Sequence, residues 1–248
     1  TVMVVYVRLI DRKLCLRFKD LLKSDRRLTR DFLRYGMPIV GGQIVWSVNM
    51  MGQTMILGRF DAGVIAATSI AGMLHNMMYI AMNGFSSAVG IITGKTVGAG
   101  RIDKIREYSR TTQVIFLGIG VLSGIAVFLL RDPFISMYNA SPAAVEYSRQ
   151  FINVISITIV GTCYQAACLF GLVKSGGDIA FVFKNDTIFV FLVVLPSAIL
   201  ASYLGAPPWV VFACLKSDQT LKCFVAAVKI NRYNWMKNLT HDNTETEA

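Results

Sequence analysis

The chain has 248 residues, of which 54% are hydrophobic and only 16% are charged, and its mean hydropathy is +0.52. Soluble domains carry about 25% charged residues, so a soluble fold would lack the polar surface that it needs. The net charge of +10 does not indicate nucleic-acid binding, because the Lys and Arg residues lie between apolar runs and form no continuous basic face. We therefore expect a membrane protein with basic loops.

The N-terminal part predicts a junction between two membrane-embedded regions. Residues 1–7 are apolar and lack the basic start of a signal peptide, so we expect them to end a preceding transmembrane helix of a longer protein. Residues 8–34 hold ten Lys or Arg residues, and leucines alternate with the charges. This pattern predicts a basic cytoplasmic linker, with an amphipathic helix that lies on anionic lipid headgroups.

Six long apolar runs follow, at about 36–57, 62–93, 111–130, 151–173, 187–205 and 207–228. A transmembrane helix needs roughly 20 mostly apolar residues, whereas the strands of a membrane barrel are short and alternating. The last run is the least apolar because it contains Lys216, Asp218 and Lys222, and we expect Asp218 and Lys222 to pair at i and i+4. The sequence therefore predicts an all-α, polytopic bundle of six transmembrane helices.

The Lys and Arg residues predict the sidedness of this bundle. Residues 8–34 hold ten of them, 94–110 hold five, the connection after 151–173 holds two, and the region after 207–228 holds three, which makes twenty. The alternate connections hold only Arg59, Arg131 and Arg149. Because basic loops stay in the cytoplasm, we expect both ends of this segment to be cytoplasmic.

Polar side chains inside the apolar runs predict a cavity, because intramembrane polar groups are costly and tend to face the bundle or a water-filled space. Such groups form two adjacent stripes on the helix 36–57 and one face of each of the helices 62–93 and 151–173. Interhelical hydrogen bonding explains any one of them alone, but the set favours a functional cavity. The expected lining residues are Gln43, Ser47, Met50, Gln53, Thr54, His75, Tyr79, Met82, Thr162 and Gln165.

Glycines and charges mark two helix ends. Gly94 and Gly98 form a small-residue pair that allows helices to approach closely, and Gly100 can terminate the helix 62–93. After the helix 151–173 comes the densest cluster of charges, from Lys174 to Asp178. Two interpretations stay open there: an ordinary turn built on glycines, or an Asp178 carboxylate that binds a cation or proton or pairs with Lys174.

Neither a metal site nor an enzyme active site is indicated. The five cysteines include no Cys-x-x-Cys pair, and most lie in apolar runs, where Cys acts as a small hydrophobe. His75 is the one histidine within the predicted spans, which is too little for acid–base chemistry. We expect no cofactor and no nucleic-acid partner.

Four short stretches at characteristic places carry a family resemblance. They are Tyr35-Gly36-Met37-Pro38, then Gly94-x-x-x-Gly98-Ala99-Gly100-Arg101, then the stretch from Phe170 to Asp178 with Gly171, Lys174 and Gly177, and last Pro208-Trp209-Val210-Val211 with Trp235 further on. In this order and at this spacing, the chain resembles the C-terminal half of a multidrug and toxic compound extrusion (MATE) transporter.

The resemblance implies one six-helix lobe of a two-lobe transporter. Residues 35–230 would form this lobe, 8–34 would link it to the missing N-terminal lobe, and 231–248 would form a cytoplasmic tail. The implied function is a secondary antiporter of the cell membrane that exports organic, often cationic, compounds in exchange for Na⁺ or H⁺. Its partners would be the small-molecule substrate, the lipid bilayer and the missing lobe.

The chain departs from the family pattern at two positions. Lys174 stands where the family has Arg, and the helix 36–57 has no carboxylate where many members carry one for the cation site. Asp178 matches an acidic position in the family's tenth helix. The candidates for cation coupling are therefore Asp178, Gln43 and Asn49, since a hard cation prefers oxygen ligands. Alternatively, coupling resides in the missing lobe.

The resemblance also leaves a related activity open. A lipid-linked precursor flippase of the same exporter superfamily would need basic residues that face its cleft and bind pyrophosphate. Few Lys or Arg residues occur within the first five predicted helices, which favours the antiporter.

Overall fold

The computed structural model describes residues 26–236, which are helical apart from short turns and contain no β-strand. Predictions on residues 1–25 and 237–248 (the preceding helix end at 1–7, most of the linker and the end of the tail) lie outside the described residues. The helices are α2 (Arg26–Leu57), α3 (Ala62–Gly98), α4 (Ile102–Ser136), α5 (Pro142–Gln165), α6 (Ile179–Ile188), α7 (Leu195–Tyr203) and α8 (Pro208–Asn231). Two π-helical segments, η1 (Ala166–Lys174) and η2 (Phe189–Val194), make α5–η1 and α6–η2–α7 continuous.

The six predicted helices are confirmed, and most extend beyond their predicted bounds. The reason is that hydropathy marks only the apolar part of a helix, whereas polar residues at its ends continue the same hydrogen-bonded turns. The part of the predicted linker from Arg26 onward is accordingly the first part of α2. Four continuous helices are long and apolar enough to cross a membrane: Ala62–Gly98, Asp103–Ser136, Pro142–Lys174 and Ile179–Tyr203.

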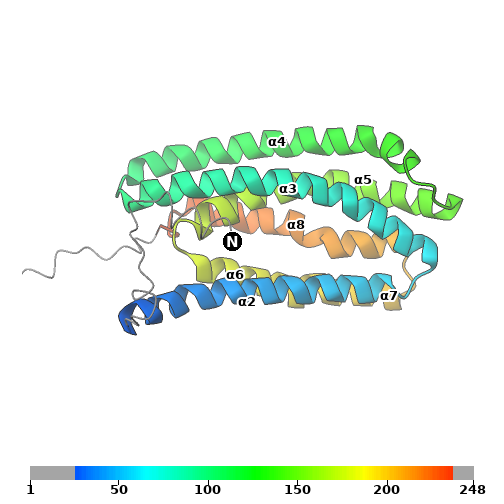
Figure 1. The fold of residues 1–248 in the computed structure, drawn as a ribbon, viewed down its shortest axis with the longest axis horizontal. Coiled ribbons are helices and arrows are strands. Elements are labelled where there is room, and N and C mark those ends of the chain that lie inside the picture. Colours follow the sequence, from blue (N-terminus) through cyan, green and yellow to red (C-terminus); the bar gives the residue numbers. More distant parts are fainter. Residues whose placement is uncertain (1–25, 237–248) are drawn as a thin grey trace, which may run out of the picture.

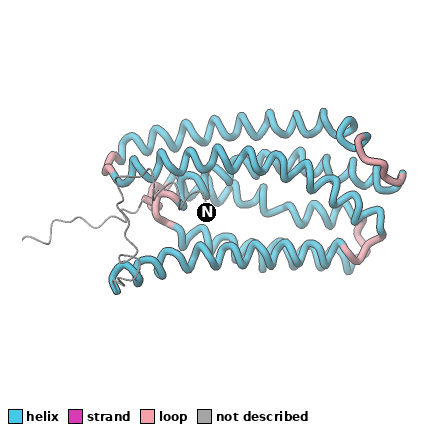
Figure 2. Tube along the Cα trace, in the orientation of Figure 1, coloured by secondary structure: helices cyan, strands magenta, loops and turns pink. Residues whose placement is uncertain are grey.

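Short turns with specific end signals connect neighbouring helices. The Asp61 side chain accepts the Val64 N–H at 3.1 Å at the start of α3, and the Ser141 hydroxyl accepts the Ala144 N–H at 3.3 Å at the start of α5. At the end of α3, Gly100 has a φ of +68°. This left-handed conformation suits glycine and ends the helix. Figure 2 shows how little of the described chain lies outside helices.

The helices run antiparallel, so the bundle has two distinct ends (Figure 1). One end, on the left in the figure, gathers the start of α2, the α3–α4 turn, the η1–α6 turn and the end of α8. These segments hold the excess of Lys and Arg, and we call this the basic end. The opposite end holds the α2–α3, α4–α5 and α7–α8 turns.

The continuous helix α5–η1 is the centre of the bundle and the most buried of the apolar helices. Helix α4 packs along α5, while α2 packs mainly on α6 and α7 and barely contacts α3. Helix α8 contacts both groups, and its Phe212 stacks on Phe151 of α5 with ring centroids 4.3 Å apart. The separation of α2 from α3 positions the site described below.

The close helix approach occurs one turn away from the place that the sequence suggested. A Cβ at Gly98 would meet nothing within 4 Å, and one at Gly94 would meet only the Ser175 carbonyl oxygen at 3.9 Å. In the contact between α3 and η1, the crowded positions are Gly90, against the Ser175 side chain, and Gly171, against α3. Spacing alone does not reveal which small residue faces a neighbouring helix, because that depends on how the helix is rotated.

Candidate substrate cavity

A cavity of about 550 Å³ lies where α2 separates from α3, and α5, η1, α6, η2 and α8 complete its wall. Aromatic side chains in the wall come from Trp46, Tyr79, Phe170 and Phe212. Its polar and charged side chains are Asn49, Gln53, Thr54, Thr68, Ser69, His75, Asn76, Thr162, Gln165, Asp186, Lys216, Asp218, Gln219 and Lys222. This mixture lies inside a bundle whose outer faces are largely apolar.

Most of the side chains expected to line a cavity do line this one: Met50, Gln53, Thr54, His75, Tyr79, Thr162 and Gln165. Gln43 and Ser47 do not line it; both are exposed, and the Ser47 hydroxyl donates to the Gln43 carbonyl oxygen at 2.9 Å. Met82 belongs instead to the packed core. The cavity face of α2 is thus centred on the stripe of Trp46, Asn49 and Gln53.

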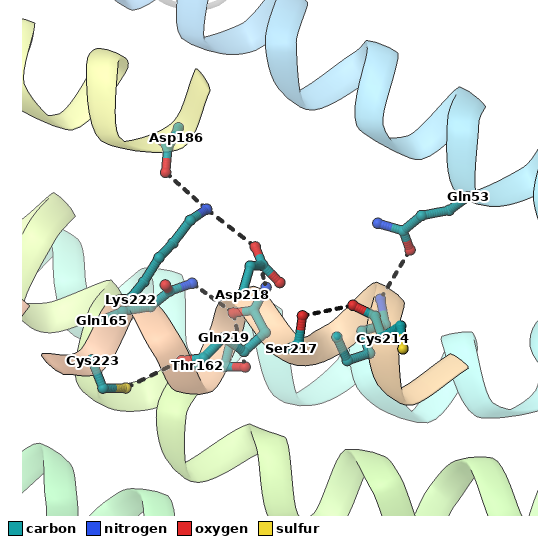
Figure 3. Close-up of polar contacts among 11 residues, drawn as sticks. Gln53, Thr162, Gln165, Asp186, Cys214, Ser217, Asp218, Gln219, Lys222 and Cys223 are labelled. Atoms are coloured by element: carbon teal, nitrogen blue, oxygen red, sulfur yellow. Dashed lines mark hydrogen bonds and ion pairs between the residues drawn. The ribbon is translucent and has the colours of Figure 1, made fainter. Parts of the chain in front are cut away.

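A cluster of charges lies in the wall of the cavity (Figure 3). The Lys222 ammonium lies 3.0 Å from an Asp186 oxygen of α6 and 3.1 Å from an Asp218 oxygen of its own helix. Lys222 and Asp218 are only 6% and 4% exposed. Buried charges are tolerated when they are paired, so the two carboxylates explain how this ammonium lies inside the bundle.

An amide network connects the charge cluster to α5. The Gln219 side-chain oxygen accepts from the Thr162 hydroxyl at 3.2 Å and from the Gln165 amide. The Gln219 amide in turn donates to Asp218 at 3.4 Å. Two residues expected from sequence, Thr162 and Gln165, therefore help to hold one carboxylate of the cluster in place.

Lys216, one to two turns before Lys222 on α8, has different surroundings. Its ammonium donates to the Gln53 oxygen of α2 at 3.4 Å and lies 5.7 Å from the centre of the Phe212 ring. Both partners are electrically neutral. Lys216 therefore brings a positive charge to the cavity without the direct carboxylate contacts that Lys222 has.

The three candidates for cation coupling are not brought together. Asn49 lines the cavity, whereas Gln43 and Asp178 do not. Asp178 lies at the start of α6 near the basic end, buried, and its carboxylate is 2.7 Å from the Lys229 ammonium. A cation role for Asp178 stays a prediction, and any such cation would have to compete with Lys229.

The turn before Asp178 has a structural explanation. Gly177 has a φ of +101°, a conformation that favours glycine. Gly176 lies against the fully buried Trp235, so a Cβ at this position would overlap the indole ring. Lys174, which stands where the family pattern has Arg, lies over the Phe170 ring at 5.8 Å. These residues shape the basic end rather than the cavity.

Sequence reasoning missed four ionisable cavity residues: Asp186, Lys216, Asp218 and Lys222. The pairing of Asp218 with Lys222 was predicted and is present, but its place in the cavity wall was not. A usable signal existed, because ionisable residues within a transmembrane helix mark functional sites more often than packing. Within residues 26–236, no group of three or more His, Cys, Asp or Glu side chains is arranged to hold a metal ion.

Comparison with known proteins places the chain in a family. The MatE family model matches residues 38–200, well over half of the sequence. The chain belongs to the MatE family. The resemblance inferred from the sequence motifs is thereby confirmed, and so is the expectation that the chain belongs to a multi-pass membrane protein. The MatE match ends before α8, so Lys216, Asp218 and Lys222 lie outside the matched segment, whereas Asp186 lies inside it.

Several curated proteins are similar to this MatE chain. It is 26% identical over 194 residues to the probable multidrug resistance protein NorM of Halalkalibacterium halodurans. The aligned segment covers 77% of this chain and 42% of that protein. The NorM of Oceanobacillus iheyensis is 25% identical over 77% of this chain and 43% of its own length. The NorM of Listeria innocua is 21% identical over all of this chain and 55% of its own length. The chain thus spans about half the length of the curated relatives that it matches.

Proposed function

We propose that this chain is the C-terminal lobe of a secondary active antiporter that exports organic, often cationic, compounds in exchange for Na⁺ or H⁺. The observation that carries the proposal is a polar and charged cavity within an apolar bundle. The printed names of the relatives, probable multidrug resistance proteins, support it. The antiporter would lie in the cell membrane with the basic end in the cytoplasm, and an N-terminal lobe would complete the cleft.

Coupling requires that the cation and the substrate favour opposite-facing states of the protein. The Asp186 and Asp218 carboxylates supply a means, because both contact one ammonium, that of Lys222. A proton or Na⁺ that binds these carboxylates would release Lys222 and loosen the connection between α6 and α8. We therefore favour this cluster over Asp178 as the coupling site of this lobe.

The test is transport by the full-length protein in liposomes with an imposed ion gradient. We expect gradient-driven accumulation of a cationic dye, and its loss when the gradient is dissipated. Removal of Na⁺ at fixed pH then separates the two coupling ions. A D218N variant should reduce gradient-driven transport strongly, and exposed Lys184, substituted as K184M, is the matched control. Equal dye retention with and without the protein, once its presence in the membrane is confirmed, would contradict the proposal.

The flippase alternative gains one observation, since Lys216 and Lys222 both face the cavity. Recognition of a pyrophosphate favours several uncompensated cations. Lys222 is held between two carboxylates, which leaves Lys216 as the single lysine of this cavity without a direct carboxylate contact. The cavity therefore suits one anionic group better than a pyrophosphate. Scrambling of a lipid-linked pyrophosphate by the same liposomes would reverse this preference.

A further inference from the structure

We infer that Lys216 forms an anion-binding subsite of the cavity, one that takes the carboxylate of an aromatic organic compound. The inference rests on the proposed export function and specifies its substrate class. It predicts that compounds with a free carboxylate bind this lobe better than otherwise identical compounds without one.

The three lysines of α8 differ in their partners. Lys222 contacts the carboxylates of Asp186 and Asp218, and Lys229 contacts the carboxylate of Asp178 at 2.7 Å. Lys216 instead makes a 3.4 Å hydrogen bond to the neutral amide of Gln53. A charge-assisted hydrogen bond to a carboxylate is shorter and roughly twice as strong as a neutral one. An incoming carboxylate therefore gains more at Lys216 than at the two paired lysines.

Charged and titratable side chains share the cavity wall with Lys216. Asp218 attracts Lys216 electrostatically, but one oxygen of the Asp218 carboxylate already accepts hydrogen bonds from Lys222 and Gln219. His75 of α3 also lies within electrostatic range of Lys216 and lines the same cavity. The wall that Lys216 faces thus also includes an imidazole from α3.

The remainder of the cavity wall offers aromatic side chains and a buried amide. The aromatic side chains of Trp46, Tyr79, Phe170 and Phe212 suit a flat, apolar body. The buried Asn49 side-chain oxygen has no hydrogen-bond partner among the described residues. Asn49 lies one helical turn from Gln53, so a donor group on the same compound could reach Asn49 while its carboxylate reaches Lys216. The recognised compound would therefore carry a carboxylate and a hydrogen-bond donor on an aromatic scaffold.

The experiment uses two probes that differ only in charge: a xanthene dye with a free benzoic acid and its methyl ester. Binding to the purified full-length protein is measured by fluorescence polarisation. We expect the acid to bind more tightly than the ester. K216M should weaken binding of the acid by about tenfold or more, since a charged hydrogen bond is lost, and that of the ester by less than about twofold. K216R should retain most of the acid binding, and K184M should bind as the unchanged protein does.

Three results would overturn the inference: no binding of the acid, equal binding of acid and ester, or an equal loss of both in K216M. Thermal stability of each variant in detergent separates loss of a contact from loss of folding, and the charge-retaining K216R provides a second test if K216M is unstable. Failure of the proposed function would look different. Neither dye would then move with an ion gradient, while the difference in binding between acid and ester would still decide the role of Lys216.

Discussion

The cavity and the basic end of the bundle each hold a lysine of α8 that pairs with a buried carboxylate, but in different surroundings. In the cavity, Lys222 bridges Asp186 and Asp218, and a hydrogen-bond network extends to α5. At the basic end, Lys229 pairs with Asp178 and lies over the Phe181 ring, 4.2 Å from its centre. Burial of an ion pair therefore does not by itself indicate a functional site. An ion pair that can exchange a partner with a ligand must also border a space that admits one.

The largest expected effect comes from removal of Lys222, because this leaves the buried Asp218 carboxylate and the half-buried Asp186 carboxylate without a counter-charge. K222M should lower the free energy of unfolding by about 3–5 kcal/mol. Thermal unfolding of the full-length protein in detergent, followed by size exclusion, measures the change. The triple variant K222M/D186N/D218N should recover much of the stability without recovering coupled transport. If K222M alone were as stable as the unchanged protein, the cluster would not be a tightly coupled unit.

The corresponding change at the basic end is D178N, which removes the carboxylate that pairs with Lys229. We expect a smaller loss of stability, about 1.5–3 kcal/mol, because the Lys229 side chain is partly exposed to solvent. Transport per folded molecule should be close to normal if Asp178 only fastens α6 to α8. Loss of ion coupling in a D178N protein that folds well would instead show that Asp178 is a coupling residue, as the sequence first indicated.

The packing of α5 on α8 beside the cavity can be tested at Gly161. A Cβ there would meet the backbone carbonyl of Gln219, which cannot move without α8. Overpacking of this kind costs about 1–3 kcal/mol. G161A should also weaken transport, because Gln219 holds Asp218. The control G42A lies on the cavity side of α2, where a Cβ would meet nothing within 4 Å, and it should be tolerated. Equal effects of the two variants would argue against this tight packing.

The smallest expected effect concerns the start of η1, near the cavity. The Ser86 hydroxyl of α3 donates to the Ala166 carbonyl oxygen at 2.6 Å, where the change to π-helical hydrogen bonding leaves backbone oxygens in need of partners. S86A should cost about 0.5–1.5 kcal/mol, the usual worth of one hydrogen bond. The exposed Ser87 next to it, substituted as S87A, is the control. A neutral S86A would mean that η1 does not depend on this contact.

Local sequence signals predicted much of the fold. Apolar runs of sufficient length located all six helices, and the charge excess grouped the turns at the same end that the structure shows. The i and i+4 spacing of Asp218 and Lys222 predicted their contact, because two such residues on one helix are neighbours whatever surrounds them. Helix rotation was less predictable. The stripe of Gln43, Ser47, Met50 and Thr54 reaches the cavity only through Met50 and Thr54, whereas Asn49 and Gln53 of the adjacent stripe both line it.

The sequence by itself determined that six helices form and where they turn. These properties depend on residues close together in the chain, and the cost of unpaired backbone groups in lipid enforces them. Only the tertiary structure decided which charges meet: Asp186 approaches Lys222 while Asp178, eight residues earlier on the same segment, approaches Lys229. That choice depends on how α6 and α8 rotate and pack against each other. The same packing leaves Lys216 beside the cavity with a neutral partner.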